Sequence, residues 1–146
     1  MKNEEYQIQC KIANYLEELK LKKIVTRFTA IPNSTYTKSI IQKIKNTKSG
    51  LRAGLCDLFI IIKNEAFFVE VKTKKGTLQE TQKEWIRDLH NSNTKAYIVA
   101  SLEEFKVLID DIIQSQKKEL EMEDTAYFVK NMKGSKLFKK HILKIK

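Results

Sequence analysis

The segment AFFVEVKTKKGTLQETQKEW (66–85) decides the fold, because it joins an apolar strand to a polar turn and a helix. Within its strand, Glu70 and Lys72 are two residues apart, so both side chains lie on the same face. A charged side chain in an apolar strand costs free energy unless it is paired, bound to a metal or kept for chemistry. Neighbouring segments indicate which of these applies.

The residues before this segment predict a hairpin. DLFIIIKNEAFFVEVK (57–72) contains two apolar runs around a short turn at residues 64–65. A two-residue turn there pairs Asp57 with Lys72 and makes Glu70 the diagonal neighbour of Asp57. All three side chains then share one face, whereas a three-residue turn would place Asp57 on the other face.

Helical periodicity predicts a helix on each side of the hairpin. Apolar residues recur at helical spacing over residues 4–19, with Glu5 at the start of that stripe. Thr77 and Glu80 have the spacing of a capping box that begins a second helix. Gln82 falls on the apolar stripe of this helix, so its amide is expected to face the sheet.

The other segments complete an α/β pattern. We expect strands at IVTRF (24–28) and KAYIVAS (95–101), a mobile loop over 32–50, and a short strand or edge element at TAYFV (125–129). Ser101 and Glu104 predict a second capping box, which opens a helix through residue 113. This order predicts a mixed central sheet flanked by helices in an α/β domain over 1–116, followed by a basic C-terminal extension over 117–146.

Charge and composition narrow the function classes. The chain carries a formal net charge of +10, and its lysines concentrate in 38–52 and 130–146, which contain no acidic residue. Such patches attract nucleic-acid phosphates, although a solubilising surface would give the same charge. The sequence lacks a signal-peptide pattern and any apolar run of membrane-spanning length, which favours a cytoplasmic protein.

The acidic and basic side chains of the hairpin suit metal-assisted chemistry. Asp57 and Glu70 offer the hard oxygen ligands that Mg²⁺ or Mn²⁺ prefers. Lys72 is close enough to orient a water molecule and to neutralise charge on a phosphate. Structural alternatives remain open at this point, since Glu70 and Lys72 could instead form a solvated ion pair with Asp57.

These residues resemble a known family. Asp57 with Glu70-Val71-Lys72 matches the D…(D/E)-x-K signature of the PD-(D/E)XK nucleases, whose restriction-endonuclease-like core is a mixed sheet flanked by helices. RAGLCDL (52–58), the glutamate that starts the first helix, and Leu78 with Gln82 and Trp85 resemble the VRR-NUC (virus-type replication-repair nuclease) branch. The resemblance covers roughly residues 5 to 110 and excludes the lysine tail.

The resemblance implies a site. The implied metal ligands are Asp57, Glu70, the backbone carbonyl of Val71 and, as a further candidate, Glu5. Lys72 would position the attacking water, and Glu5 and Gln82 would support the site from the flanking helices. The residues expected to contact nucleic acid are Lys43, Lys45, Lys48, Arg52, Lys74 and Lys75.

The sequence is therefore interpreted as a Mg²⁺-dependent (or Mn²⁺-dependent) DNA endonuclease. The resemblance implies selectivity for branched DNA or Holliday junctions, a setting in DNA repair, and a homodimer. Tyr127, Phe128 and Val129 supply apolar material for a dimer interface, although a core role fits them equally well. Two alternatives stay open: a catalytically silent nucleic-acid-binding module, and a nuclease that acts on RNA.

Overall fold

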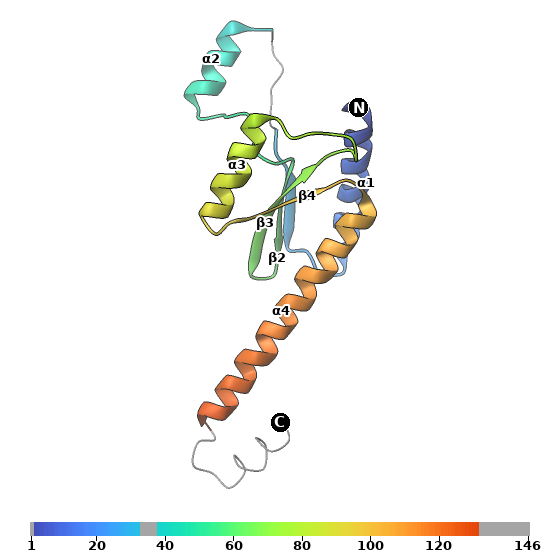
Figure 1. Cartoon of the computed structure of the whole chain (residues 1–146), viewed down its shortest axis with the longest axis vertical. Coiled ribbons are helices and arrows are strands. Elements are labelled where there is room, and N and C mark those ends of the chain that lie inside the picture. The colour runs from blue at the N-terminus through green and yellow to red at the C-terminus, as the bar shows by residue number, and fades with distance from the viewer. Residues whose placement is uncertain (1, 33–37, 132–146) are drawn as a thin grey trace. The chain divides into compact units, whose positions relative to one another are not determined.

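The computed structural model describes residues 2–32 and 38–131 (Figure 1). Its elements, in chain order, are α1 (Lys2–Leu21), β1 (Arg27–Ala30), α2 (Ile40–Lys48), β2 (Leu58–Ile62), β3 (Glu65–Val71), α3 (Glu80–Asn91), β4 (Lys95–Val99) and α4 (Leu102–Asn131). The chain forms two compact units, Met1–Phe105 and Lys106–Lys146. All residues of the predicted site lie in the first unit. The predicted domain boundary after residue 116 stays a prediction.

The four strands form one mixed sheet in the order β1-β2-β3-β4. The strands β1, β2 and β3 pair antiparallel, while β4 pairs parallel to β3. The parallel pair requires a crossover, and α3 supplies it between the two strands. The α/β fold with a mixed sheet flanked by helices is thus confirmed.

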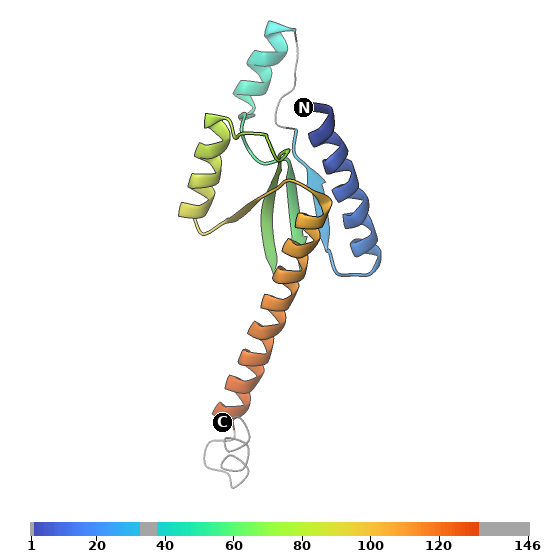
Figure 2. The ribbon, with the colours of Figure 1, turned by 45° about the vertical axis from the view of Figure 1, so that its right-hand side comes forward.

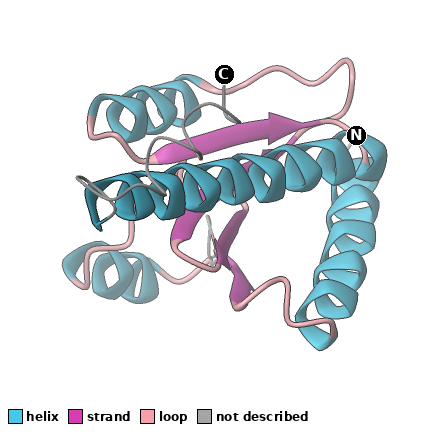
Figure 3. Ribbon diagram, turned by 90° about the horizontal axis from the view of Figure 1, so that it is seen from below, coloured by secondary structure: helices cyan, strands magenta, loops and turns pink. Residues whose placement is uncertain are grey.

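One face of the sheet carries the core of the first unit. Alternate residues of β2 and β3 on this face are at most 1% exposed: Leu58, Ile60, Ile62, Phe67, Val69 and Val71. In α1, which contacts β3, Ile12 and Leu16 are fully buried. The helix α3 contacts β4 and lies on the other side of the strands from α1 (Figures 2 and 3). Glu70 alternates with the core residues, so it belongs to the α3 side of the sheet.

The hairpin turn differs from the prediction by one residue. Ile62 pairs with Glu65, so the turn consists of residues 63–64, and Lys63 takes the positive φ of 50° that a tight hairpin turn accommodates. Glu65 is thereby the first residue of β3, and its carboxylate forms an ion pair with Lys95 of β4. The register therefore shifts by two residues, which preserves the face of every side chain. When this register is continued by one residue beyond the pair Leu58–Val69, Asp57 lies opposite Glu70. The predicted pairing of Asp57 with Lys72 was therefore wrong.

The predicted strand at 24–28 was wrong in its first part. The backbone N–H groups of Ile24 and Val25 both donate to the carbonyl of Leu19, and Lys23 has a φ of 60°. These residues close the C-terminus of α1, as left-handed residues commonly do at helix ends. The strand β1 consequently begins at Arg27.

Two segments expected to be non-helical form helices. Within the predicted loop over 32–50, α2 begins after Ser39, whose side chain accepts a hydrogen bond from the backbone N–H of Gln42. Residues 33–37 lie outside the described residues. The segment at 125–129, predicted as a strand or edge element, continues the backbone of α4. Its side chains and the lysine tail over 132–146 lie outside the described part of the chain, so the predicted dimer surface is untested.

The second capping box is confirmed. The Ser101 side chain accepts a hydrogen bond from the N–H of Glu104 at 3.1 Å. The Glu104 carboxylate reaches back to the N–H of Ala100, one residue before the expected donor. Among the described residues, no helix combines the length and the apolar character that crossing a membrane requires.

Candidate active site

Asp57 lies directly before β2 and is joined to β3 by its side chain. Its Oδ2 accepts a hydrogen bond from the backbone N–H of Val71 at 2.8 Å. Its own carbonyl accepts from the N–H of Ile31 at 2.8 Å, which continues the contact with the β1 side. The carboxylate is therefore held at the end of the hairpin on the face that carries Glu70.

Glu70 is a buried carboxylate at the end of β3, with a relative exposure of 1%. Its Oε1 lies 3.0 Å from Lys72 Nζ and accepts a hydrogen bond from Gln82 Nε2 at 2.5 Å. Its Oε2 is buried and has no hydrogen-bond partner among the residues that the structure describes. Burial, with the charge of Asp57 adding to it, raises the pKa of Glu70 to about 7, and Lys72 partly opposes the shift. A buried oxygen without a partner is costly, which makes this position a candidate for ligand binding.

Lys72 lies between two carboxylates. Its Nζ is 3.0 Å from Glu70 Oε1 and 3.9 Å from Oε1 of Glu5, which comes from the first turn of α1. Its backbone N–H donates to the carbonyl of Val99, so the ladder between β3 and β4 extends one residue past the strand and fixes the position of Lys72. The ammonium is thus held over Glu70 with limited exposure of its side chain, 13%.

Gln82 connects the start of α3 to the buried carboxylate. Its Oε1 accepts a hydrogen bond from the N–H of Gln79 at 2.9 Å, which leaves its Nε2 to donate to Glu70. The predicted capping box of Thr77 and Glu80 was wrong, because the N-cap is Gln79 and Glu80 is already the first helical residue. The amide on the predicted apolar stripe does face the sheet.

The loop before Asp57 packs closely on α3. Gly54 has a φ of 99°, and a Cβ on it would lie 2.8 Å from the backbone C and O of Thr81. The indole Nε1 of Trp85 donates to the carbonyl of Ala53 at 2.9 Å. Gly54 and Trp85 both belong to the motifs that carry the family resemblance. In the structure they hold the segment before Asp57 against α3, the helix that carries Gln82.

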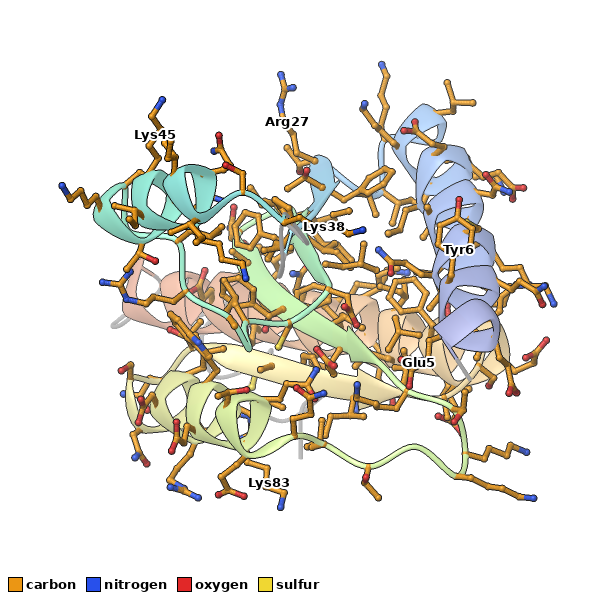
Figure 4. All side chains as sticks on the ribbon, turned by 90° about the horizontal axis from the view of Figure 1, so that it is seen from above. Glu5, Tyr6, Arg27, Lys38, Lys45 and Lys83 are labelled. Carbon is orange, nitrogen blue, oxygen red and sulfur yellow. The ribbon has the colours of Figure 1, made fainter. Side chains whose placement is uncertain are left out.

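The predicted nucleic-acid contacts fall into two groups. Lys43, Lys45 and Lys48 are exposed on α2, and Lys74 and Lys75 are exposed in the turn after Lys72. Arg52 has a structural role that the sequence did not indicate, because its guanidinium donates to the carbonyls of Thr47 and Leu51, both at 3.0 Å, and so caps the end of α2. Figure 4 shows Lys45 pointing away from the sheet and Glu5 at the start of α1.

All five predicted catalytic side chains are brought to one end of the sheet. They come from the hairpin, the first turn of α1 and the first turn of α3, and they are Asp57, Glu70, Lys72, Glu5 and Gln82. Sequence alternation indicated the shared face. No sequence signal indicated the hydrogen bond from Val71 to Asp57, because it depends on the backbone geometry at the strand ends.

The model of the VRR-NUC domain matches residues 1–103 of the chain. The chain belongs to the VRR-NUC family. Membership implies nuclease activity with DNA as the substrate, and VRR-NUC nucleases are generally metal-dependent. Searches of curated proteins and of solved structures gave no match.

The donor set of this VRR-NUC site fits a hard divalent cation. Asp57 and Glu70 are adjacent carboxylates, and the buried Glu70 Oε2 is without a partner among the described residues. The same residues contain no group of three or more His, Cys, Asp or Glu side chains placed to hold a metal. A cation here would therefore have few protein ligands, as Mg²⁺ commonly does when it keeps several waters for its substrate. It would also offset the repulsion between the two carboxylates that contributes to the raised pKa of Glu70.

Proposed function

We propose that this VRR-NUC protein is a Mg²⁺-dependent endonuclease that hydrolyses phosphodiester bonds in branched DNA. The observation that supports the chemistry best is the buried, unpartnered Oε2 of Glu70 beside Asp57 and Lys72. A carboxylate kept in this state lowers stability unless a ligand compensates for it, and a cation is the ligand that its charge favours.

In the proposed site, Asp57, Glu70 and the backbone carbonyl of Val71 would hold Mg²⁺ or Mn²⁺. Glu5, the further candidate ligand, lies 3.9 Å from Lys72 Nζ and would have to move to join them. A bound ion supplies a Lewis acid for the phosphate and lowers the pKa of water. The chain's own groups do the positioning. Gln82 holds Glu70 through the hydrogen bond to Oε1, which leaves Oε2 for the cation.

Lys72 is proposed to act on the water and the phosphate. An ammonium group has three N–H donors, and the carboxylates of Glu70 and Glu5 lie near two sides of it. A further donor can orient the attacking water or contact a phosphate oxygen, and the positive charge stabilises the anionic transition state. The products expected from this family's chemistry are 5′-phosphate and 3′-hydroxyl ends.

The exposed lysines are proposed to hold the DNA backbone without reading sequence. They are Lys43, Lys45 and Lys48 of α2, together with Lys74 and Lys75 beside the site. Arg52 would contribute through the guanidinium nitrogens other than Nη1, which donates to carbonyls at the end of α2. Such contacts make binding strongly dependent on salt.

Branched DNA as the substrate goes together with a proposed homodimer. One chain carries one Asp57–Glu70–Lys72 site, and paired cuts in a four-way junction need two sites held in fixed geometry. Two-fold symmetry is the commonest way to place two identical sites. We also propose an intracellular setting in DNA repair.

The deciding experiment incubates the full chain with labelled linear, flapped and four-way DNA and with an RNA of matching sequence, in Mg²⁺ and in EDTA. Mg²⁺-dependent cutting of the four-way DNA in preference to the linear duplex is the expected result. Preferred cutting of RNA, or binding to DNA without any cutting, would favour the two alternatives instead. A mixed dimer with one Asp57→Asn subunit should cut only one strand per binding event, and light scattering gives the mass of the assembly.

A further inference from the structure

The helix α2 exposes an apolar face that nothing in its own unit covers in the described residues. Ile40, Ile41 and Ile44 have relative exposures of 73%, 67% and 49%, and none of the residues of α2 is buried. Their positions i, i+1 and i+4 place them within an arc of about 100° on the helix. Large apolar side chains gathered on an exposed helix commonly mark a binding surface.

The ends of α2 are held without burial of its sides. Ser39 caps its N-terminus, and the Arg52 guanidinium and the backbone N–H of Ser49 donate to carbonyls of its last turn. An isolated helix of this length is marginal in water. The caps help to keep α2 helical, but they do not explain why its isoleucines are exposed to solvent. A bound partner that covers the apolar face would account for them.

The charge around the apolar face selects the kind of partner. No acidic residue occurs from Lys38 to Cys56. At 100° per residue, Lys48 falls within the arc of the isoleucines, and Lys45 and Lys43 flank it on the two sides. A surface that is apolar in the middle and cationic at both margins complements DNA whose bases are accessible between its phosphates.

The position of α2 connects this face to the candidate active site. Figures 1 and 2 show α2 beyond the end of the sheet at which α1 and α3 begin, the end that carries the predicted catalytic side chains. The segment that joins α2 to Asp57 is anchored on α3 by the hydrogen bond from Trp85 to Ala53 and by the close approach of Gly54. DNA that reaches the site can therefore contact α2 as well.

We propose that the apolar face of α2, made of Ile40, Ile41 and Ile44, packs against unstacked bases of branched DNA while Lys43, Lys45 and Lys48 contact the flanking phosphates. The inference rests on the proposed nuclease function and specifies its substrate as DNA with unstacked bases next to the cleaved bond. Paired duplex keeps its bases stacked, so it offers phosphates to the lysines but no apolar surface to the isoleucines. The helix thus distinguishes branched DNA from linear duplex.

The test measures binding of the full chain in EDTA, which prevents cutting. Fluorescence anisotropy compares four-way junction DNA with linear duplex, and 2-aminopurine at the branch point reports base unstacking. One variant carries Ile40→Gln, Ile41→Gln and Ile44→Gln, which retains helix propensity. A second carries Lys43→Gln, Lys45→Gln and Lys48→Gln, and Leu21→Gln, at an 84% exposed position of α1, is the matched apolar control.

The isoleucine variant should bind the junction on the order of tenfold more weakly, since each buried isoleucine contributes a large apolar area. Its affinity for duplex should change by less than about twofold, because the lysine contacts remain. It should also lose the 2-aminopurine signal. The lysine variant should weaken both complexes and reduce the slope of log K against log salt by about 2 to 3. Leu21→Gln should match the wild type.

Wild-type junction affinity in the isoleucine variant would overturn the proposal. So would a lower mass of that variant by light scattering, which would assign the face to a second copy of the chain. Loss of binding to phosphatidylserine vesicles with unchanged DNA binding would assign it to a lipid surface. If the wild type binds no DNA, the proposed function fails as well, whereas intact binding with unchanged junction preference rejects this inference alone.

Discussion

Gln82 joins the first turn of α3 to Glu70, because its Oε1 accepts from the N–H of Gln79 while its Nε2 donates to Glu70 Oε1 at 2.5 Å. One amide thereby completes the helix cap and holds the buried carboxylate. The two functions can be separated by substitution, because only one of them needs an N–H donor.

We expect Gln82→Glu to retain the N-terminal cap of α3 and to lose the hydrogen bond that holds Glu70. A carboxylate still accepts from the N–H of Gln79, but it repels Glu70 instead of donating to it. Gln82→Ala should lose both, with α3 destabilised by about 1 kcal/mol. Both variants should cut DNA far more slowly than the wild type, and thermal unfolding should separate them. Full activity in Gln82→Glu would contradict the positioning role.

Glu70→Gln and Asp57→Asn should reduce metal-dependent cleavage to background while DNA binding persists, since the lysines provide most of the phosphate affinity. In the wild type, Mg²⁺ or Mn²⁺ should raise the melting temperature, because a ligand that binds only the folded state stabilises it. Neither variant should show this shift. Glu65→Gln is the control, since Glu65 is on the same strand but pairs with Lys95. A metal-induced shift that survives in Glu70→Gln would refute the ligand assignment.

Lys72→Ala should lower turnover by about a hundredfold to a thousandfold, as loss of one group that stabilises transition-state charge commonly does. Metal affinity measured by calorimetry should not fall, because an ammonium cannot ligate a cation and its removal takes away a competing positive charge. Lys74→Ala provides an exposed lysine as a control. A matching loss of metal binding in Lys72→Ala would assign the lysine a structural role.

Gly54→Ala should destabilise the fold more than Gly50→Ala. Both glycines have a positive φ, 99° and 93°, so both substitutions introduce backbone strain of about 1 to 3 kcal/mol. Only the Cβ at Gly54 would also meet another backbone, that of Thr81, whereas nothing lies within 4 Å of the Cβ position at Gly50. Urea denaturation of the two variants measures the difference. Equal losses would mean that the contact with α3 relaxes at little cost.

Local pattern was sufficient for the parts of the fold that depend on neighbouring residues. Alternation placed Glu70 and Lys72 on one face, and the apolar stripe of α3 directed Gln82 to the sheet. The hairpin register was less well determined, because residues 63–65 are all polar and a turn at 63–64 or at 64–65 keeps every side chain on the same face. Alternation does not distinguish these two turns, and the turn was predicted one residue too late.

The other differences between the predicted and the observed structure lie in segments whose sequence does not show the apolar periodicity of a core-facing element. The helix α2 has exposed isoleucines, so its apolar residues gave no indication of a core-facing stripe, although Ser39 was available as a capping signal. The apolar segment at 125–129 resembled a strand, but QKKELEME (116–123), shortly before it, consists of strong helix formers and α4 continues through both segments. The hydrogen bond from Val71 to Asp57 required the three-dimensional end of the hairpin.

The hairpin also sets the order in which the site can assemble as the chain folds. Asp57, Glu70 and Lys72 belong to one continuous segment closed by the turn at residues 63–64. Hairpins form in roughly 1 to 10 μs, whereas the parallel pairing of β4 must wait for the whole α3 crossover. The two carboxylates are therefore brought together early, and Gln82 reaches Glu70 only when α3 docks. Until α3 docks, no amide holds Glu70 against the repulsion from Asp57, so we expect a divalent cation present during refolding to accelerate it.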